Sequence, residues 1–480
     1  MRTELLTRKE LQEDYCPPIP EPQWRRLGAL RLLLTLRRNP LECWAREHFE
    51  KLIIFGGLPF RQVVVINDPN AIRRVLIENA ANYQKDILQR RVLSAGLGEG
   101  LLSAEQDRWR AQRRTLAPLF TPRVVRGFAP AMLDAAAALA ARWEGLDGAV
   151  TDVAAEMRRL TLDVLQRTIF SDGLGRDTEQ FRTAMATYFD TVGRVGLFDV
   201  VAVPAFVPRL NRLRVRSALR FFESAIDEMI AARRGRSAAY SSRESTDILD
   251  LLLNAVDPET GERMSAAEVR SNVLTFISAG HETTANALTW SLFLLSQSPK
   301  WLCKVETEVE ANSGQSAAQN PSEQLVITRA VMEEAIRLYP PIAAISRVAM
   351  AADELAGEAI PEGCIVVIAP YVLHRHHRIW DRPGIFDPSR FLPGAREQIS
   401  RYAYMPFGIG PRTCIGSIFA LQEATLVLAA IVRDFKFQLV PGFTVAPVLR
   451  MTLRPAQGLP MIVKPKLDRR SRLIPIQPAM

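Results

Sequence analysis

The chain has 480 residues, of which 48% are hydrophobic and 24% are charged. That balance is typical of a globular protein, and it excludes a disordered chain, a coiled coil and a collagen. Lys and Arg total 61 against 52 Asp and Glu, which gives a formal net charge of +9. So small an excess argues against a nucleic-acid-binding protein and favours at most a local basic surface for an acidic partner.

The five cysteines are Cys16, Cys43, Cys303, Cys364 and Cys414, and they are far apart in the sequence. Their odd number and the lack of any CxxC spacing argue against a disulfide framework or a zinc finger, and favour a reducing compartment. The N-terminal sequence is too charged for a signal peptide, and no run approaches the ~20 apolar residues of a membrane helix. We therefore expect a cytoplasmic protein without a transmembrane anchor.

In chain order, the first clear element is a predicted strand at Phe60–Ile66, followed by a turn at Asn67–Pro69 that opens a helix. Gln84–Leu102 has no clear period and contains three closely spaced glycines, which predicts a long loop. From Gln106 the pattern is helical, with breaks, to about Ser298. Later in the chain, short β-branched runs alternate with prolines and glycines.

Helix therefore dominates, and a minor sheet is assembled from both ends of the chain. The predicted fold class is mainly α with a minor β region (α+β). Because the sheet draws on distant segments, we expect one intertwined domain over residues 1–480 rather than separable units. Residues 1–16 and 466–480 are expected to be mobile ends.

The longest predicted helix begins at a capping box formed by Ser265 and Glu268 and continues to about Leu295. Its centre carries Ala279 and Gly280, two small residues that leave room for a flat group to pack against the helix. Gly280 costs about 1 kcal/mol relative to alanine in a helix interior.

The next turn of the same helix carries Glu282 and Thr283. Thr283 is expected to donate a hydrogen bond back to the Ala279 carbonyl. An acid beside a hydroxyl offers a path for protons. The alternative is a kinked helix whose polar groups satisfy one another, and this segment alone does not decide between them.

A second predicted helix, Thr328–Leu338, carries Glu334 and Arg337 at a spacing that places them on one face. Most such pairs lie on the surface. Arg390, in an irregular stretch rich in aromatic residues, adds a second cation, which favours a buried carboxylate shared by two arginines. Arg347 is a further cation with no nearby partner in the sequence.

The most informative stretch is FGIGPRTCIG, Phe407–Gly416, in which a single cysteine precedes a helical pattern. At a helix N-terminus, the dipole and free N–H groups are expected to lower the pKa of the Cys414 thiol. Phe407 would shield the sulfur from water, and Arg412 suits a haem carboxylate. A shielded thiolate suits an axial haem ligand.

Two alternatives remain for Cys414. One is a buried cysteine that packs as a small hydrophobic side chain. The other is a nucleophile, which needs a base, and the one histidine cluster is formed by His374, His376 and His377. We interpret that cluster as a polar turn, since its spacing is poor for zinc.

Five motifs in order resemble those of the cytochrome P-450 superfamily over roughly residues 17–465. They are the FGIGPRTCIG loop, AGHETT at 279–284, the Glu-x-x-Arg helix at 334–337, Pro-x-Arg-Phe at 388–391 and Trp-x-x-x-Arg at 109–113. Two positions depart from the usual pattern: Ser389 stands where the family often has Glu, and His376 where it has Asp or Asn.

The resemblance implies a triangular helical body around a buried haem b, with Cys414 as the axial thiolate ligand and O2 as cosubstrate. It implies that Glu282 and Thr283 relay protons to iron-bound dioxygen, and that Glu334, Arg337 and Arg390 form a structural ion-pair network. The haem-binding residues that it implies are Trp109, Arg113, Ala279, Gly280, Arg347, Phe407, Arg412 and Gly416.

The function that follows is a haem-thiolate monooxygenase that hydroxylates or epoxidises a lipophilic small molecule, such as a fatty acid or terpenoid. Electrons are expected from a separate ferredoxin or flavodoxin with its NAD(P)H-dependent reductase, docked on a basic face with Arg108, Arg110, Arg114 and Arg412. The alternatives are a peroxygenase or isomerase on the same scaffold, and a non-catalytic haem-binding sensor. The expected pocket segments are Leu88–Leu102, Ala186–Val207, Phe276–Ala287, Ile342–Ile345 and Leu449–Leu453.

Overall fold

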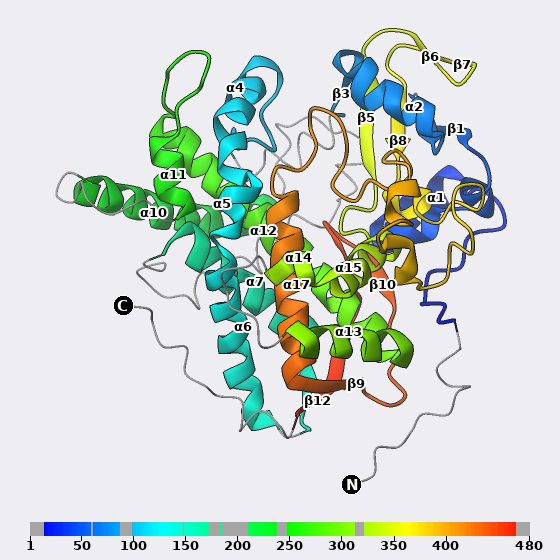
Figure 1. Ribbon diagram of the computed structural model, residues 1–480. Helices are drawn as coiled ribbons and strands as arrows, with labels where there is room; N and C mark the ends of the chain where they lie inside the picture. The colour runs from blue at the N-terminus through cyan, green and yellow to red at the C-terminus, as the bar shows by residue number, and fades with distance from the viewer. Residues whose placement is uncertain are drawn as a thin grey trace.

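The computed structural model describes residues 14–58, 61–86, 98–146, 148–171, 183–184, 210–237, 247–312 and 321–466. Helices make up most of this part, as Figure 1 shows. They are α1 (Ala29–Arg38), α2 (Pro69–Arg73), α4 (Gln106–Leu116), α5 (Pro122–Arg126), α6 (Ala129–Trp143), α7 (Val153–Ile169), α10 (Leu210–Ser237), α11 (Ile248–Asn254), α12 (Ala266–Ser296), α13 (Pro299–Asn312), α14 (Pro321–Gln324), α15 (Val326–Leu338), α16 (Pro370–Leu373) and α17 (Ser417–Asp434).

The strands form small sheets. The largest has the order β1 (Ile53–Leu58), β2 (Arg61–Ile66), β8 (Ile365–Ile368), β5 (Ile345–Ala349) and β3 (Tyr83–Gln84). The others are β4 (Val150–Asp152) with β12 (Pro460–Pro465) and β9 (Phe435–Leu439), β6 (Asp353–Leu355) with β7 (Glu358–Ile360), and β10 (Pro447–Leu449) with β11 (Leu453–Pro455). The fold is mainly α with a minor β region, as predicted.

The largest sheet joins segments from the two halves of the chain. Strand β2 pairs in parallel with β8, so that Val63 lies beside Ile365. The predicted strand and the turn that follows it are confirmed, because the Asp68 side chain accepts hydrogen bonds from the first backbone N–H groups of α2. Strand β1 was not predicted from the sequence, since Gly56 and Gly57 interrupt its apolar run.

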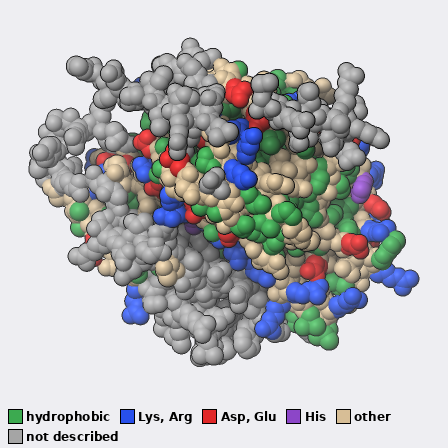
Figure 2. Space-filling model, turned by 90° about the horizontal axis from the view of Figure 1, so that it is seen from below, with side chains coloured by type: hydrophobic (Ala, Val, Ile, Leu, Met, Phe, Trp, Pro, Cys, Tyr) green, Lys and Arg blue, Asp and Glu red, His purple; other side chains and the backbone are tan. Residues whose placement is uncertain are grey.

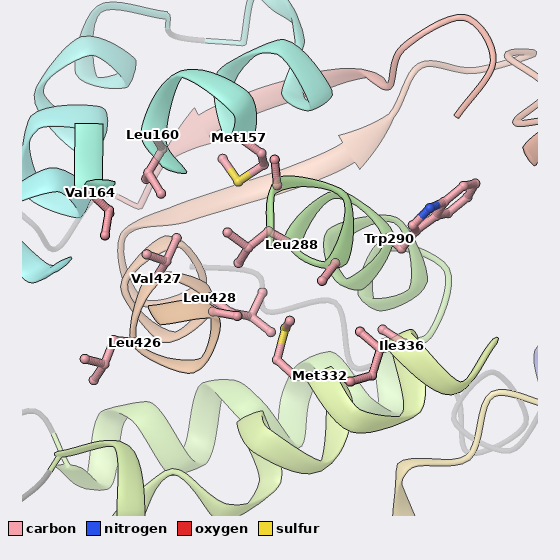
Figure 3. Close-up of a cluster of buried hydrophobic side chains, with 14 of the residues drawn as sticks. Met157, Leu160, Val164, Leu288, Trp290, Met332, Ile336, Leu426, Val427 and Leu428 are labelled. Atoms are coloured by element: carbon pink, nitrogen blue, oxygen red, sulfur yellow. The ribbon is translucent and has the colours of Figure 1, made fainter. Parts of the chain in front are cut away.

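The core lies where four long helices meet. Figure 3 shows Met157 and Leu160 of α7, Leu288 of α12, Met332 of α15 and Leu428 of α17 pointing toward one another. Helix α12 has 31 residues and begins with the predicted capping box, in which Ser265 and Glu268 exchange hydrogen bonds. At ~1.5 Å per residue it crosses most of the molecule.

The predicted ion-pair network is buried on α15. Glu334 and Arg337 are both fully buried, and two guanidinium N–H groups of Arg337 donate to the carboxylate over 2.6 and 2.8 Å. The Arg390 Nε atom lies 3.7 Å from the same carboxylate. Arg337 also donates to the carbonyls of His374, Pro383 and Ile385, and Glu334 accepts the Asp387 N–H, so the pair fixes the irregular stretch after α16.

The histidine cluster lies in a turn, as predicted, with His377 exposed, but two of its three rings are not at the surface. His374 and His376 are fully buried. The Nε2 atom of His374 accepts the Met405 N–H over 3.0 Å, and His376 Nε2 lies 3.1 Å from the Lys51 carbonyl. Burial lowers the pKa of His374 to about 3, so the ring is neutral and has a structural role as a hydrogen-bonding group.

One segment of 25 residues, Pro122–Leu146, contains an 18-residue stretch with a mean hydropathy of 1.4, which the sequence analysis did not single out. By length and composition alone it passes the test for a membrane span, a test that core helices of soluble proteins also pass. In the structure it is divided into α5, α6 and a short 3-10 turn. Met132, Leu139 and Trp143 of α6 are buried in the main core.

Charges of both signs alternate over the face of the molecule shown in Figure 2, where hydrophobic side chains lie between them. The net charge of +9 is therefore not gathered into one basic field on this face.

We predict that Glu334→Ala lowers the free energy of unfolding by about 3–5 kcal/mol, because it leaves the Arg337 guanidinium buried without its counter-ion. Urea-induced unfolding followed by tryptophan fluorescence measures the change. The control is Asp163→Ala, which breaks a more exposed pair with Arg167 and should cost at most about 1 kcal/mol. Equal losses in the two variants would contradict the prediction.

Candidate active site

The cysteine loop is a tight turn that rests on the π-helical turn Arg74–Glu78. Gly408 and Gly410 have φ angles of +68° and +77°, which favour glycine. A Cβ atom on Gly410 would overlap the Leu76 carbonyl oxygen, so this position requires glycine for close approach as well. The Cys414 N–H donates to the Phe407 carbonyl over 2.8 Å, which closes the turn.

Cys414 lies two residues before Gly416, the N-cap residue of α17. The sequence analysis expected a lowered thiol pKa there, and this expectation is wrong for the protein alone. Burial raises the pKa of Cys414, and it outweighs the opposing effects of the Gly416 N–H and the nearby Arg113 cation. A bound metal ion would reverse this balance, because a coordinating thiol is deprotonated.

Cys414 lies deep inside the protein, yet its side chain is exposed. A thiol that faces an internal space has both properties. Arg113, on α4, donates from Nη1 to the Thr413 carbonyl over 2.9 Å and so ties α4 to the loop. Phe407 packs against the main core.

Three cations gather beside the loop. Arg412 lies with its guanidinium carbon 4.3 Å from the centre of the Trp109 ring and donates to Glu105 over 2.8 Å. Lys85 Nζ lies 3.0 Å from the other oxygen of Glu105. Arg347 is the third cation. Burial lowers the pKa of Lys85 to about 8, and the positive charges of Arg412 and Arg347 contribute to this shift. Burial and the charge of Arg412 also lower the pKa of Arg347.

Lys85 and Glu105 were not found by the sequence analysis. Lys85 follows the two-residue strand β3 and is only 6% exposed. The residues around it in the sequence show no pattern that would distinguish it from a surface lysine. Glu105 precedes α4 and shows no side-chain capping bond there. Both are recognised only once the distant Arg347 and Arg412 are placed beside them.

On α12, the predicted back-bond is confirmed: the Thr283 hydroxyl donates to the Ala279 carbonyl over 2.6 Å. Val273 and Leu288 on the same helix are fully buried, yet Ala279 is exposed and Thr283 is half-buried. An exposed alanine in the middle of a core helix marks a face that no described side chain covers.

Gly280 has a packing role that the sequence analysis did not foresee. A Cβ atom at this position would lie 3.3 Å from Leu165 Cδ2 on α7. The glycine therefore lets α7 and α12 approach closely. This close contact explains why a glycine is present, so no flat ligand is needed to explain it on the side of α12 that faces α7.

Glu282 is on the same turn of α12 as the exposed Ala279 but is itself buried. It is 2% exposed, and burial raises its pKa, an effect that the cation of Arg454 opposes. Arg454 Nη1 lies 3.2 Å from Glu282 Oε1. A carboxyl with a raised pKa beside a hydroxyl suits a group that holds and passes protons.

These residues fit a haem. The structure combines an accessible thiol at a helix N-terminus, three cations beside the loop for the two haem carboxylates, and an exposed small residue on α12. Lys85, Arg347 and Arg412 outnumber the two carboxylates near them, Glu105 and Asp86, by one charge, which favours a further anionic group among them.

Comparison with known proteins gives the family. The family model for cytochrome P450 matches residues 17–462. The chain is 33% identical to cyclooctat-9-en-7-ol 5-monooxygenase of Streptomyces melanosporofaciens over 92% of this chain and 94% of that protein. It is 32% identical to cyclooctatin synthase of the same organism, over 90% of this chain and 93% of that protein.

The structure agrees. It superposes on the crystal structure of the cytochrome P450DA heme domain with a TM-score of 0.79 and 27% sequence identity, covering 94% of this chain and 98% of that chain. The chain therefore belongs to the cytochrome P450 family. It is a haem-thiolate monooxygenase, which uses haem with a cysteine thiolate as axial ligand and reacts with O2.

The structure brings together three of the five expected pocket segments. Asn286 of α12 donates to the Thr452 hydroxyl over 2.9 Å, which places the β10–β11 hairpin beside α12. Leu453 N–H donates to the Pro341 carbonyl over 3.0 Å, which places the segment before β5 beside the hairpin. Ala186–Val207 and most of Leu88–Leu102 lie outside the described residues, as do most of the two chain ends expected to be mobile.

We predict that Lys85→Met speeds the loss of haem about tenfold, since Lys85, which lies beside Arg412 and Arg347, would donate a charge-assisted hydrogen bond to a haem carboxylate. The rate of haem transfer to excess apomyoglobin, read in the absorption spectrum, measures this without any turnover. Lys51→Met is the matched control, because Lys51 is exposed and pairs only with Glu47 among the described residues. Identical transfer rates for both variants would contradict the role of Lys85.

Proposed function

We propose that Cys414 is the axial ligand and that this monooxygenase inserts oxygen into a C–H bond or a double bond of a lipophilic small molecule. The observation that carries the proposal is the pairing, on one turn of α12, of the buried Glu282 with Thr283 beside the exposed Ala279. The haem supplies oxygen activation when it is bound. The residues of the chain hold it, exclude water and deliver protons.

The haem-holding roles follow from the contacts described above. Arg412 and Arg347 offer guanidinium groups, and Trp109 supports Arg412 through its ring face. Arg113 holds the loop through the Thr413 carbonyl. Gly416 offers its N–H to the sulfur, which stabilises a thiolate. Phe407 covers one side of the loop.

Proton delivery is assigned to Glu282 and Thr283. Burial raises the pKa of Glu282, which favours the proton-bearing form of this carboxyl relative to an exposed glutamate. The Thr283 hydroxyl accepts and donates hydrogen bonds in turn. This pair favours a monooxygenase over the peroxygenase or isomerase alternative, whose reactions take up no net protons from solvent.

The substrate proposal rests on the apolar residues that surround this turn. Ile342 is 39% exposed, and Leu449 and Met451 are half-buried on the hairpin beside α12. The relative named cyclooctat-9-en-7-ol 5-monooxygenase takes, by its name, an unsaturated alcohol. We infer a substrate of the same class, a mostly hydrocarbon molecule such as a terpenoid.

The electron donor is proposed to be a ferredoxin or flavodoxin with its NAD(P)H-dependent reductase. The four arginines expected to face it all have acidic partners: Arg108 pairs with Glu99, Arg110 with Asp107 over 2.6 Å, Arg114 with Asp257 over 2.8 Å and Arg412 with Glu105 over 2.8 Å. The docking surface is therefore revised to Arg123 and Arg126, which are exposed on α5. Helix α5 packs against α17, the helix that follows Cys414.

We also propose a cytoplasmic location. All five cysteines lie in the described residues and are free, which suits a reducing compartment.

Thr283→Ala is expected to uncouple the enzyme, because the proton path loses its hydroxyl. NAD(P)H consumption continues while product per NAD(P)H falls about tenfold and peroxide rises. Product and peroxide are quantified against NAD(P)H oxidised. The control is Thr289→Ala, which removes a similar back-bond of 2.7 Å on the same helix, away from Glu282.

In both variants the ferrous carbon monoxide spectrum should keep the long-wavelength maximum of a thiolate-ligated haem. A maximum where histidine-ligated globins absorb would refute Cys414 as ligand. Unchanged coupling in Thr283→Ala would refute the proton relay and favour the peroxygenase alternative.

Reversing the docking charges in Arg123→Glu/Arg126→Glu is expected to slow reduction by an acidic ferredoxin about tenfold at low salt, with the difference shrinking as salt is added. Stopped-flow reduction of the haem under carbon monoxide measures the rate. Arg31→Glu, on α1 across the molecule in Figure 1, is the control. A loss of equal size in the control would point to net charge rather than to this surface.

A further inference from the structure

We propose that Arg454, on strand β11, is a positioning residue that holds the carboxyl group of Glu282 in place for proton delivery. The inference deepens the proposed function and rests on it, since it assumes that Glu282 carries protons to the haem side of α12. It assigns a catalytic task to the β10–β11 hairpin, which is distant in sequence from α12.

The contact itself is well sheltered. Arg454 Nη1 donates to Glu282 Oε1 over 3.2 Å, with 24% of the arginine side chain exposed and 3% of the glutamate side chain. The second carboxyl oxygen, Oε2, is buried and has no hydrogen-bond partner among the described residues. One oxygen is therefore fixed by a cation and the other remains available to a mobile donor or acceptor such as water.

The hairpin does not need Arg454 to stay on α12. Asn286 Nδ2 donates to Thr452 Oγ1 over 2.9 Å, and Trp290 Nε1 donates to the Leu453 carbonyl over 3.2 Å. The Leu453 N–H is bound to the Pro341 carbonyl on the other side. Because these three bonds hold the hairpin, the pairing of Arg454 with Glu282 is not required for its placement.

The electrostatic surroundings of Glu282 make Arg454 the dominant counter-charge. The groups that act on the carboxyl are Arg454 and Thr452 from the hairpin and the more remote Arg158 from α7. The neighbouring His281 is neutral, because burial lowers its pKa to about 3. Loss of Arg454 therefore leaves the pKa of Glu282 still higher and its side chain free to turn.

The arrangement also links the acid to the substrate region. Leu449 and Met451 flank the turn of the same hairpin and are half-buried. A ligand that touches these side chains contacts the element that carries Arg454. Occupancy of the pocket and orientation of the acid are in this way connected through one short hairpin.

The test compares Arg454→Met, Arg454→Lys and Glu282→Gln in the holoenzyme with its redox partners and a turned-over substrate. Arg454→Met should lower product per NAD(P)H about tenfold, the effect of one charge-assisted hydrogen bond, with little change in KM. The pH limb of kcat that reports Glu282 should move to higher pH, since the counter-cation is gone. Arg454→Lys should restore most of the coupling and the original limb.

The matched control is Arg142→Met, which removes an arginine of similar exposure, 28%, from an ion pair of 3.3 Å with Glu156 between α6 and α7. If Arg454→Met behaves like this control, or changes only thermal stability, the inference is overturned. If Glu282→Gln itself leaves coupling and pH profile unchanged, the proposed proton relay fails instead. If Glu282→Gln uncouples and Arg454→Met does not, only the role of Arg454 is refuted.

Discussion

The Arg337 guanidinium is the point on which much of the structure depends. It is fully buried, and its donors bind the Glu334 carboxylate and three carbonyl oxygens of the stretch after α16. That stretch has little regular structure, so its backbone polar groups need partners from elsewhere. His374, whose carbonyl binds Arg337, in turn accepts the Met405 N–H just before the cysteine loop. A chain of buried hydrogen bonds thus runs from α15 to the site.

The two ionisable groups of the site, Cys414 and Glu282, have opposite electrostatic requirements. Water must be kept away from the sulfur and from Glu282, and burial raises the pKa values of both groups. For Glu282 the raised pKa is useful, because it favours the proton-bearing form of the acid. For Cys414 it opposes the thiolate, so the Gly416 N–H, Arg113 and above all the metal must favour the ionised form. Exclusion of water therefore favours the proton-bearing form of Glu282 directly, whereas the thiolate form of Cys414 needs these additional stabilising groups.

The features that could be predicted from the sequence depend on residues that are close to one another along the chain. The capping box of α12, the back-bond of Thr283 and the glycine-rich turn before Cys414 each depend on residues a few positions apart, and each is present as predicted. The ion pair on α15 was also within reach, since Glu334 and Arg337 are three residues apart. The small-residue face of α12 was found, although Gly280 proved to serve helix packing.

The features that were missed or misjudged depend on residues far apart in the chain. Arg108 and Arg114 read as free cations because Glu99 and Asp257 cannot be paired with them from sequence alone. The pKa of Cys414 was misjudged because burial, which decides it, is a property of the packed molecule. Lys85 gave no local signal, and its meaning comes from Arg347 and Arg412, which lie more than half the chain away.

Arg454 shows why such distant contacts carry function in this architecture. Helix α12 is rigid and long, so it fixes where Glu282 and Thr283 stand, but a rigid helix cannot by itself report on the pocket. The β10–β11 hairpin meets both the pocket and the acid, because it bears Leu449 and Met451 beside the proposed pocket and Arg454 against Glu282. The counter-ion of the acid is thus placed 172 residues away from it in the sequence, on a separate element. The orientation of the Glu282 carboxyl therefore depends on a contact between packed elements and not on the helix alone.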